Sequence, residues 1–418
     1  MTSDLRVSDV ERTTVEVPFR ETPKPHMNRM LPDWRYFEVC RVELACGVRG
    51  YGETMLFYPW EETTDDNVAR VRDDTATSHM WDDGVGSGLQ IALFDAVGRA
   101  LGVPAHELLG DVKRDEIPVS WWCIDMPPED WAEEAREAKR RGYRALKLKA
   151  RPWWDLRDGV EMLDDLLPPS FHVGLDFNTT MVDAANAIPV LQDLEEYSVI
   201  STFEEPISRE DEEGYRQIRS ATDVPIAHHL NYESPFESIG AGTADRYLLT
   251  DGATGMQSGA ATLGTAGKPM WHQLVGTGIT AVWGLHLAAT LETELLPGIN
   301  CHEVFDESLL AEHISVSDGS VPVPDGPGLG YEVDESAVDR LAVDMSVAVP
   351  DPERLLVVKY PDGRTYYFAT GRQLRGYAQS GELPYFEHGV ETRVVPDDGS
   401  EWWRETRDRA ESEPVVES

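Results

Sequence analysis

The sequence predicts an α/β protein in which a (β/α)8-type barrel carries an α+β capping domain. The first observation behind this prediction is a regular spacing of charged strand ends. Lys149, Asp176 and Glu204 each close an apolar, strand-like run, and they follow one another at intervals of 27 and 28 residues. That interval is about the length of one strand-helix unit, so equivalent positions should meet at one rim of a parallel barrel.

The flanking segments supply two further observations. Residues 7–53 alternate as in an antiparallel meander and a helical pattern follows over 87–101, which together predict a cap. After residue 315 the chain becomes rich in Pro, Gly and Asp, which is typical of extended structure. We therefore expect a capping domain over 1–116, a barrel over 117–318, and a C-terminal segment over 319–418 that returns to the cap with extra strands and a frayed tail.

Within the barrel region, short apolar runs alternate with amphipathic helices. The helix expected over 128–141 has Glu129 and Asp130 in its first turn and stops before Gly142. The eight expected strands are Val119–Ile124, Ala145–Lys149, His172–Asp176, Val199–Phe203, Val224–His228, Arg246–Thr250, Pro269–Gln273 and Gly298–Val304.

The charge balance argues against two classes of binding partner. The chain has 76 Asp and Glu against 37 Lys and Arg, a formal net charge of −39, which argues against binding to nucleic acid or anionic membranes. The same excess predicts a surface adapted to high salt, where screening weakens self-repulsion. No run approaches the roughly 18 apolar residues of a membrane span, and Met1–Val10 lacks the features of a signal peptide. We expect a cytoplasmic protein.

The predicted rim favours metal-assisted chemistry on a carboxylate. Asp176 and Glu204 would repel each other when buried, so a divalent cation such as Mg²⁺ or Mn²⁺ is expected between them. A lysine beside that cation has its ammonium form disfavoured, which makes Lys149 a candidate base. The cation would hold a substrate carboxylate and stabilise the charge that develops when the α-proton leaves.

The chain resembles the mandelate racemase and muconate lactonising branch of the enolase superfamily over roughly residues 10–345. The resemblance is carried by four motifs, which are Ala92-Leu93-Phe94-Asp95 running to Leu108-Leu109-Gly110, Lys147-x-Lys149, Asp176-x-Asn178 and Glu204-Glu205-Pro206. It implies Lys149 as the base, Lys147 as its electrostatic helper, and Asp176 and Glu204 as metal ligands. Family members hold Mg²⁺ under a closing cap, and we also expect a homo-oligomer.

Two regions depart from the family pattern. At strand five Leu230 stands where a third carboxylate is usual, so His229 is our replacement ligand and Glu233 the alternative. An imidazole would shift the preference towards Mn²⁺. At strand six Arg246 stands where an acid or lysine is usual, and Asp251 is more typical of a turn.

The remaining expected site residues follow from the same resemblance. His272 on strand seven would be an acid catalyst or a packed neighbour of Trp271, and Glu303 on strand eight would bind the substrate carboxylate. His26, Arg29 and Asn178 are expected substrate contacts. One good base suffices for elimination, so we expect dehydration of a sugar acid. A cycloisomerase or racemase with an apolar pocket lined by Trp121-Trp122 and Trp153-Trp154, and a non-catalytic carboxylate-binding descendant, are the alternatives.

Overall fold

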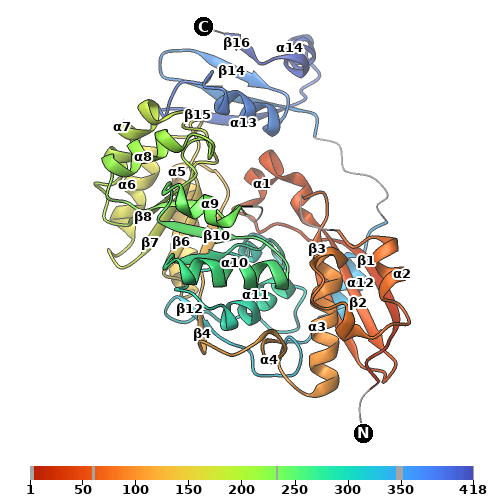
Figure 1. The fold of residues 1–418 in the computed structure, drawn as a ribbon. Helices are drawn as coiled ribbons and strands as arrows, with labels where there is room; N and C mark the ends of the chain where they lie inside the picture. Colours follow the sequence, from red (N-terminus) through yellow and green to blue (C-terminus); the bar gives the residue numbers. More distant parts are fainter. Residues whose placement is uncertain (1–3, 59–61, 232–233, 345–351, 418) are drawn as a thin grey trace.

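The chain forms a cap, a barrel and a C-terminal sheet (Figure 1). The structure is a computed structural model that describes residues 4–58, 62–231, 234–344 and 352–417. Nowhere in these residues does a helix combine the length and the apolar character that crossing a bilayer requires.

The cap is an antiparallel sheet with a helix packed across it. Its strands are β1 (Val7–Glu16), β2 (Tyr36–Leu44) and β3 (Arg49–Met55), and its helices are α1 (Lys24–Met30), α2 (Asp65–Val71), α3 (Ser87–Leu101) and α4 (Ala105–Leu109). The glycine-rich stretch 47–53 is only in part a turn, because Gly50 and Gly52 lie inside β3. A Cβ on Gly50 would lie 2.2 Å from the backbone nitrogen of Ala96, so glycine is what lets α3 approach the sheet.

The barrel contains seven parallel strands in sequence order. They are β5 (Trp121–Cys123), β6 (Ala145–Lys149), β7 (His172–Asp176), β8 (Ile200–Glu204), β9 (Ile226–His229), β10 (Arg246–Leu249) and β11 (Met270–His272). The helices around them are α5 (Pro128–Arg140), α6 (Leu156–Leu166), α7 (Ala184–Leu194), α8 (Glu212–Ala221), α9 (Pro235–Gly240), α10 (Ala253–Thr265) and α11 (Gly278–Thr290).

The eighth strand expected over Gly298–Val304 is not a regular strand. Isolated parallel bridges join Gly298 to Val119 and Ile299 to Gln273, so this segment closes the ring without forming a continuous ladder. Residues His302–Val304 form a 3-10 helix, η4, which follows Cys301 in a left-handed conformation with φ of 58°. The chain bends away because a residue in that conformation cannot continue a strand.

The end of the chain forms more structure than the predicted frayed tail. First, β12 (Ser320–Pro322) pairs with β4 (Glu116–Pro118), and α12 (Glu335–Leu341) packs on β1 of the cap. A separate antiparallel sheet follows, in the order β15 (Glu391–Pro396), β13 (Arg354–Lys359), β14 (Thr365–Phe368) and β16 (Val415–Glu417), with helices α13 (Gly371–Gln379) and α14 (Glu401–Ser412). Trp403, Ala410 and Val415 are buried against this sheet, which orders the tail.

The C-terminal unit, residues 354–417, rests on the carboxyl-terminal rim of the barrel. Trp153 and Trp154, in the loop after β6, are buried in its core beside Leu356 and Phe368. The tryptophan pair therefore packs between the two units and does not line the apolar pocket that the cycloisomerase alternative assumed. In Figure 1 this unit, drawn in blue, lies near α1 and α7 at one end of the barrel.

Candidate active site

Four charged side chains meet at the carboxyl ends of three neighbouring strands. The register pairs Lys149 with Asp176 and Asp176 with Glu204, so the predicted rim alignment is present. Lys149 Nζ lies 2.5 Å from Asp176 Oδ2, and Lys147 Nζ lies 2.6 Å from Glu204 Oε2 and 3.4 Å from Asp176 Oδ2. All four side chains are almost fully enclosed.

Burial and mutual charge set the pKa values in this cluster. Burial lowers the pKa of Lys149, and the charges of Lys147 and Arg151 add to that shift against the opposing effect of Asp176. Burial would also lower the pKa of Lys147, but Glu204 and Asp176 together raise it. The two lysines therefore differ: Lys149 loses its proton more easily than Lys147, which stays cationic.

The carboxylates respond in opposite directions. Burial alone would raise the pKa of Asp176, but Lys149, Lys147 and Arg151 hold it well below the ordinary value. Burial and the charge of Asp176 raise the pKa of Glu204. Further positive charge nearby would stabilise the ionised form of a buried carboxyl group whose pKa is raised.

His229 lies beside this cluster. Its Nε2 is 3.9 Å from Glu204 Oε1, and burial, with Lys147 and Arg209 nearby, lowers its pKa to about 3. The imidazole is thus neutral and keeps a lone pair for coordination. Among the described residues no three His, Cys, Asp or Glu side chains are arranged to hold a metal ion. The alternative ligand Glu233 lies outside the described residues.

Two further residues, Gln273 and Arg151, join the cluster, and Glu205 lies beside it, where it accepts from the backbone N–H of His229 at 3.4 Å. Sequence reasoning gave none of the three a role. Gln273 accepts a hydrogen bond from Lys147 Nζ at 2.5 Å, and Arg151 donates to the carbonyl of Asp176 at 2.8 Å and to Asn178 Oδ1 at 2.5 Å. Glu205 pairs with Arg209 at 2.8 Å and has φ of 45°. The sequence could have indicated Gln273, because strand alternation places its side chain on the same inward face as that of Trp271.

Asn178 is brought to the cluster but is already engaged. Its Oδ1 also accepts from Lys149 Nζ at 3.1 Å, and its backbone N–H donates to Asp176 Oδ1 at 2.9 Å. Its φ of 44° is unusual for a residue other than glycine and is more tolerable for asparagine. The side chain positions Lys149 and Arg151.

Other expected site residues lie elsewhere. The ring of His272 is fully buried against Gly284 and Gly298, and neither nitrogen has a hydrogen-bond partner among the described residues. It therefore faces the surrounding helix and is not in the cluster. Arg29 is paired with Asp125, and His26 Nε2 lies 2.6 Å from Asp130 Oδ2, so both expected substrate contacts have acidic partners within the protein.

Glu303 and Asp251 also stand apart from the four charged side chains. Glu303 is buried in η4, where its Oε1 lies 3.5 Å from His302 Nδ1. Asp251 accepts from the N–H of Gly252 at 2.8 Å, which fits a turn former, and it lines a small cavity against the cap.

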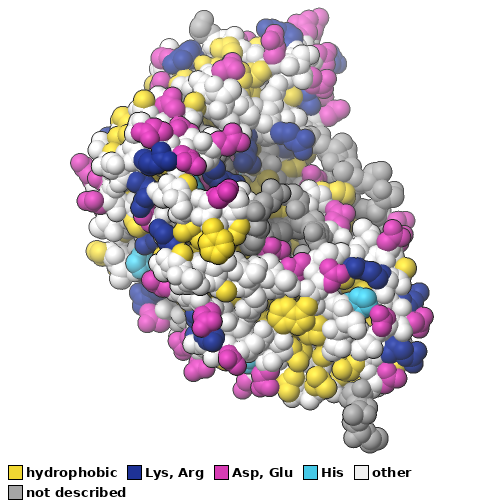
Figure 2. All heavy atoms as spheres, in the orientation of Figure 1, with side chains coloured by type: hydrophobic (Ala, Val, Ile, Leu, Met, Phe, Trp, Pro, Cys, Tyr) yellow, Lys and Arg dark blue, Asp and Glu magenta, His cyan; other side chains and the backbone are white. Residues whose placement is uncertain are grey.

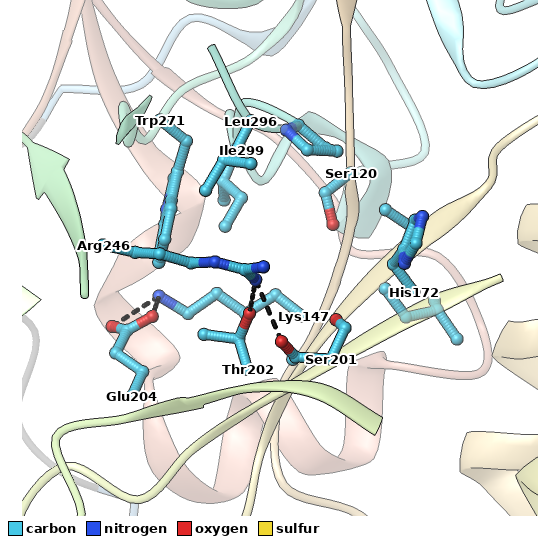
Figure 3. Close-up of a pocket in the computed structure, with 14 residues that line it drawn as sticks. Ser120, Lys147, His172, Ser201, Thr202, Glu204, Arg246, Trp271, Leu296 and Ile299 are labelled. Carbon is cyan, nitrogen blue, oxygen red and sulfur yellow. Dashed lines mark hydrogen bonds and ion pairs between the residues drawn. The ribbon is translucent and has the colours of Figure 1, made fainter. Parts of the chain in front are cut away.

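A cavity of about 230 Å³ lies inside the barrel beneath the cluster (Figure 3). Lys147 and Glu204 form its inner end, while Ala145, His172 and Arg246, which begin their strands, place its other end at the amino-terminal side. Arg246 donates to the carbonyl of Ser201 at 2.9 Å and to the hydroxyl of Thr202. Arg246 therefore belongs to the far side of the barrel and not to the rim that holds the four charged side chains.

Known proteins are similar to this chain in sequence and in fold. The family model described as "Enolase C-terminal domain-like" matches residues 130–337. Muconate cycloisomerase 1 of Rhodococcus opacus is 28% identical over 80% of this chain and 98% of its own length. D-gluconate dehydratase of Thermoproteus tenax is 26% identical over 65% of this chain, which spans only 59% of that relative.

The solved structures agree on the fold. The muconate lactonizing enzyme from Pseudomonas putida superposes with a TM-score of 0.66 and 23% identity, over 81% of this chain and 100% of its own. About a fifth of this chain is therefore additional to that structure, and the family model ends before the C-terminal unit begins. With the family model, the relatives and the fold in agreement, this chain belongs to the enolase superfamily, in its mandelate racemase and muconate lactonising branch.

Proposed function

We propose that this chain removes the proton alpha to the carboxylate of a small-molecule acid with the help of a divalent cation, and that the overall reaction is dehydration of a sugar acid. One observation carries the proposal. Lys149, with a pKa lowered by burial, lies in register with two buried carboxylates at the rim where barrel enzymes hold their substrates.

Lys149 is the base in this proposal. Its ammonium form is disfavoured by burial and by Lys147, so the neutral amine is available to take a proton. Asp176 and Asn178 hold its Nζ in place from two sides. Lys147, anchored by Glu204 and Gln273, keeps a fixed positive charge next to the reacting carboxylate.

Asp176, Glu204 and His229 are the residues that would hold the cation. Their chemistry fits because one cationic group, Lys147 Nζ, already lies 3.4 Å from Asp176 and 2.6 Å from Glu204, and an imidazole held neutral lies beside Glu204. The mixed oxygen and nitrogen set suits Mg²⁺ and also Mn²⁺. When bound, the cation would supply positive charge for the substrate carboxylate.

The scarcity of a second base favours elimination over racemisation. Racemisation needs a group on each face of the α-carbon, whereas elimination needs one good base. In the described residues β11 reaches the cluster through Gln273 and Trp271, and β10 contributes no lysine, aspartate or histidine to it. Relatives named as dehydratases of D-gluconate and D-galactonate support the choice.

Cycloisomerisation is the second candidate. It is favoured by one observation, the match to a muconate cycloisomerase over nearly all of that relative's length. Ring closure, like elimination, needs one base. The products therefore distinguish the two reactions, whereas the residues of the site do not.

The test is α-proton exchange. Gluconate, galactonate and muconate are incubated in D₂O with Mg²⁺ or Mn²⁺, and exchange and products are followed by NMR. We expect exchange on an acid sugar, and a loss of roughly 10²- to 10⁴-fold in Lys149→Ala. Lys139→Ala, at an exposed position of α5, is the matched control and should be unaffected. A Lys149→Ala variant that keeps more than about a tenth of the activity would remove Lys149 from the mechanism. Failure to bind any divalent ion would favour a non-catalytic descendant.

A further inference from the structure

The C-terminal unit has a helix that spans the mouth of the site. Gly371 at the start of α13 lies against α1 of the cap, where an added Cβ would be 3.1 Å from the carbonyl oxygen of Arg29. At the end of α13, Gln379 Nε2 donates to the carbonyl of Asn178 at 2.8 Å and to Thr179 Oγ1 at 3.0 Å. Asn178 in turn contacts Lys149. The helix thus bridges the cap and the loop after β7.

Arg375 occupies the middle of this bridge. Residues four apart lie on one face of a helix, so Gly371, Arg375 and Gln379 share the face that α13 turns towards the cap and the barrel rim. Arg375 is exposed, and within the described residues it has no ion pair, although the chain is strongly acidic. An unpaired arginine on this face is free to bind an incoming anion.

The charge of Arg375 acts on the site beneath it. Arg375 lies near enough to the buried guanidinium of Arg151 for the two positive charges to repel each other. Arg151 itself contacts Asp176 and Asn178. Because a net charge of −39 repels anionic ligands, a local group of cations at the mouth is needed to draw them in.

The unit that presents Arg375 is firmly attached. Gly389 N–H donates to Asp155 Oδ2 at 2.6 Å, Tyr385 Oη donates to the carbonyl of Met181 at 2.7 Å, and Arg354 Nη2 donates to the carbonyl of Arg29 at 2.9 Å. These bonds join it to the loops after β6 and β7 and to α1. The backbone of α13 is therefore held at a set place over the rim.

We propose that Arg375 binds a second carboxylate of the substrate, at the end remote from the α-carbon, and that the C-terminal unit is the part of the chain that selects diacids over monoacids. This inference rests on the proposed function, since it assumes that the first carboxylate binds beside Lys149. A planar guanidinium suits a carboxylate because it donates two parallel hydrogen bonds.

Calorimetric titration tests the inference with matched acids. Gluconate is compared with glucarate, and hexanoate with adipate, in the presence of Mg²⁺ and in a Lys149→Ala background so that no ligand is consumed. We expect the diacid of at least one pair to bind roughly tenfold more tightly than its monoacid. Arg375→Gln should abolish that preference and leave monoacid binding unchanged.

The control is Arg404→Gln, an exposed arginine of α14, which packs on the opposite face of the C-terminal sheet from α13. It should keep the full diacid preference. Equal binding of monoacids and diacids, or a preference that survives Arg375→Gln, would overturn the inference and leave proton abstraction untouched. Binding of none of the four acids while Mg²⁺ binds would contradict the inference and the choice of substrate class together, whereas failure to bind Mg²⁺ would contradict the proposed function itself.

Discussion

His272 shows that the side of a strand on which a residue lies decides its role. Trp271 and Gln273 point into the barrel, so His272 between them points out to Gly284 and Gly298. A Cβ on Gly298 would lie 2.0 Å from His272 Cε1, so the ring fills the space that glycine leaves. The residue packs the barrel against its helices.

We predict that His272→Leu keeps turnover and changes the pH dependence of stability. Burial lowers the folded pKa of His272 to about 4 from an unfolded value near 6.5, so the unfolded chain binds more protons between those values. The neutral ring contributes its full stability above about pH 6.5. Up to ~3 kcal/mol of that stability is lost as the pH falls towards 4.

Urea unfolding at pH 7 and pH 4.5 measures this effect. His272→Leu, which has a similar volume, should lose less stability on acidification than the wild type. Its free energy of unfolding at pH 7 should be little changed, because two buried ring nitrogens have no partner to lose. A fall in turnover as large as that of Lys149→Ala would return His272 to catalysis.

His229 supports a prediction on metal affinity. Removing a direct ligand should cost more than the roughly 10- to 100-fold typical of outer-shell partners, so His229→Ala should weaken Mg²⁺ or Mn²⁺ binding at least that much. His228→Asn is the matched control, because the ring of His228 packs on Tyr215 on the other side of β9. Equal affinities for both variants in a metal titration would reject the ligand assignment.

At the level of elements, close backbone approach explains glycines that look like turn residues. Gly50 and Gly52 lie in β3 beneath α3, and their positions against Ala96 and Gly88 leave no room for a side chain. The helix and the sheet therefore pack as one layered cap. The distance between α3 and the sheet depends on these two glycines. Their role becomes apparent only when the position of α3 is known.

Gly50→Ala should destabilise the chain by about 1–3 kcal/mol, because the new methyl group would meet Ala96 N at 2.2 Å and Ala92 O at 2.5 Å. Gly376→Ala is the contrasting change, since a Cβ in the middle of α13 meets nothing within 4 Å. It should be neutral or stabilising by up to ~1 kcal/mol. Thermal midpoints compare the two, and a stable Gly50→Ala would show that α3 does not approach β3 so closely.

For the whole molecule, the acidic surface is the dominant feature. Figure 2 shows Asp and Glu side chains spread over the visible face, with Lys and Arg interspersed among them. The formal charge of −39 makes self-repulsion a property of the entire chain. The high-salt adaptation and the homo-oligomer stay predictions.

We predict that the thermal midpoint rises with KCl. The Debye length falls from about 30 Å at 0.01 M to about 3 Å at 1 M, so molar salt should screen most of the repulsion that destabilises the compact state. A bound divalent ion should raise the midpoint further at low salt by mass action. A midpoint that is flat from dilute buffer to molar KCl would remove the case for salt adaptation.

The sequence alone determined the fold class and the pairing of Lys149, Asp176 and Glu204, because regular spacing in a parallel barrel places strand ends in register. Only the tertiary structure decided which way His272 faces, that Asp125 engages Arg29, and that Gln273 and Arg151 join the cluster. It also placed Arg375, about 200 residues beyond Asp176, on the helix over the rim of the barrel. These outcomes depend on contacts between segments far apart in the chain, and local periodicity carries no information about such contacts.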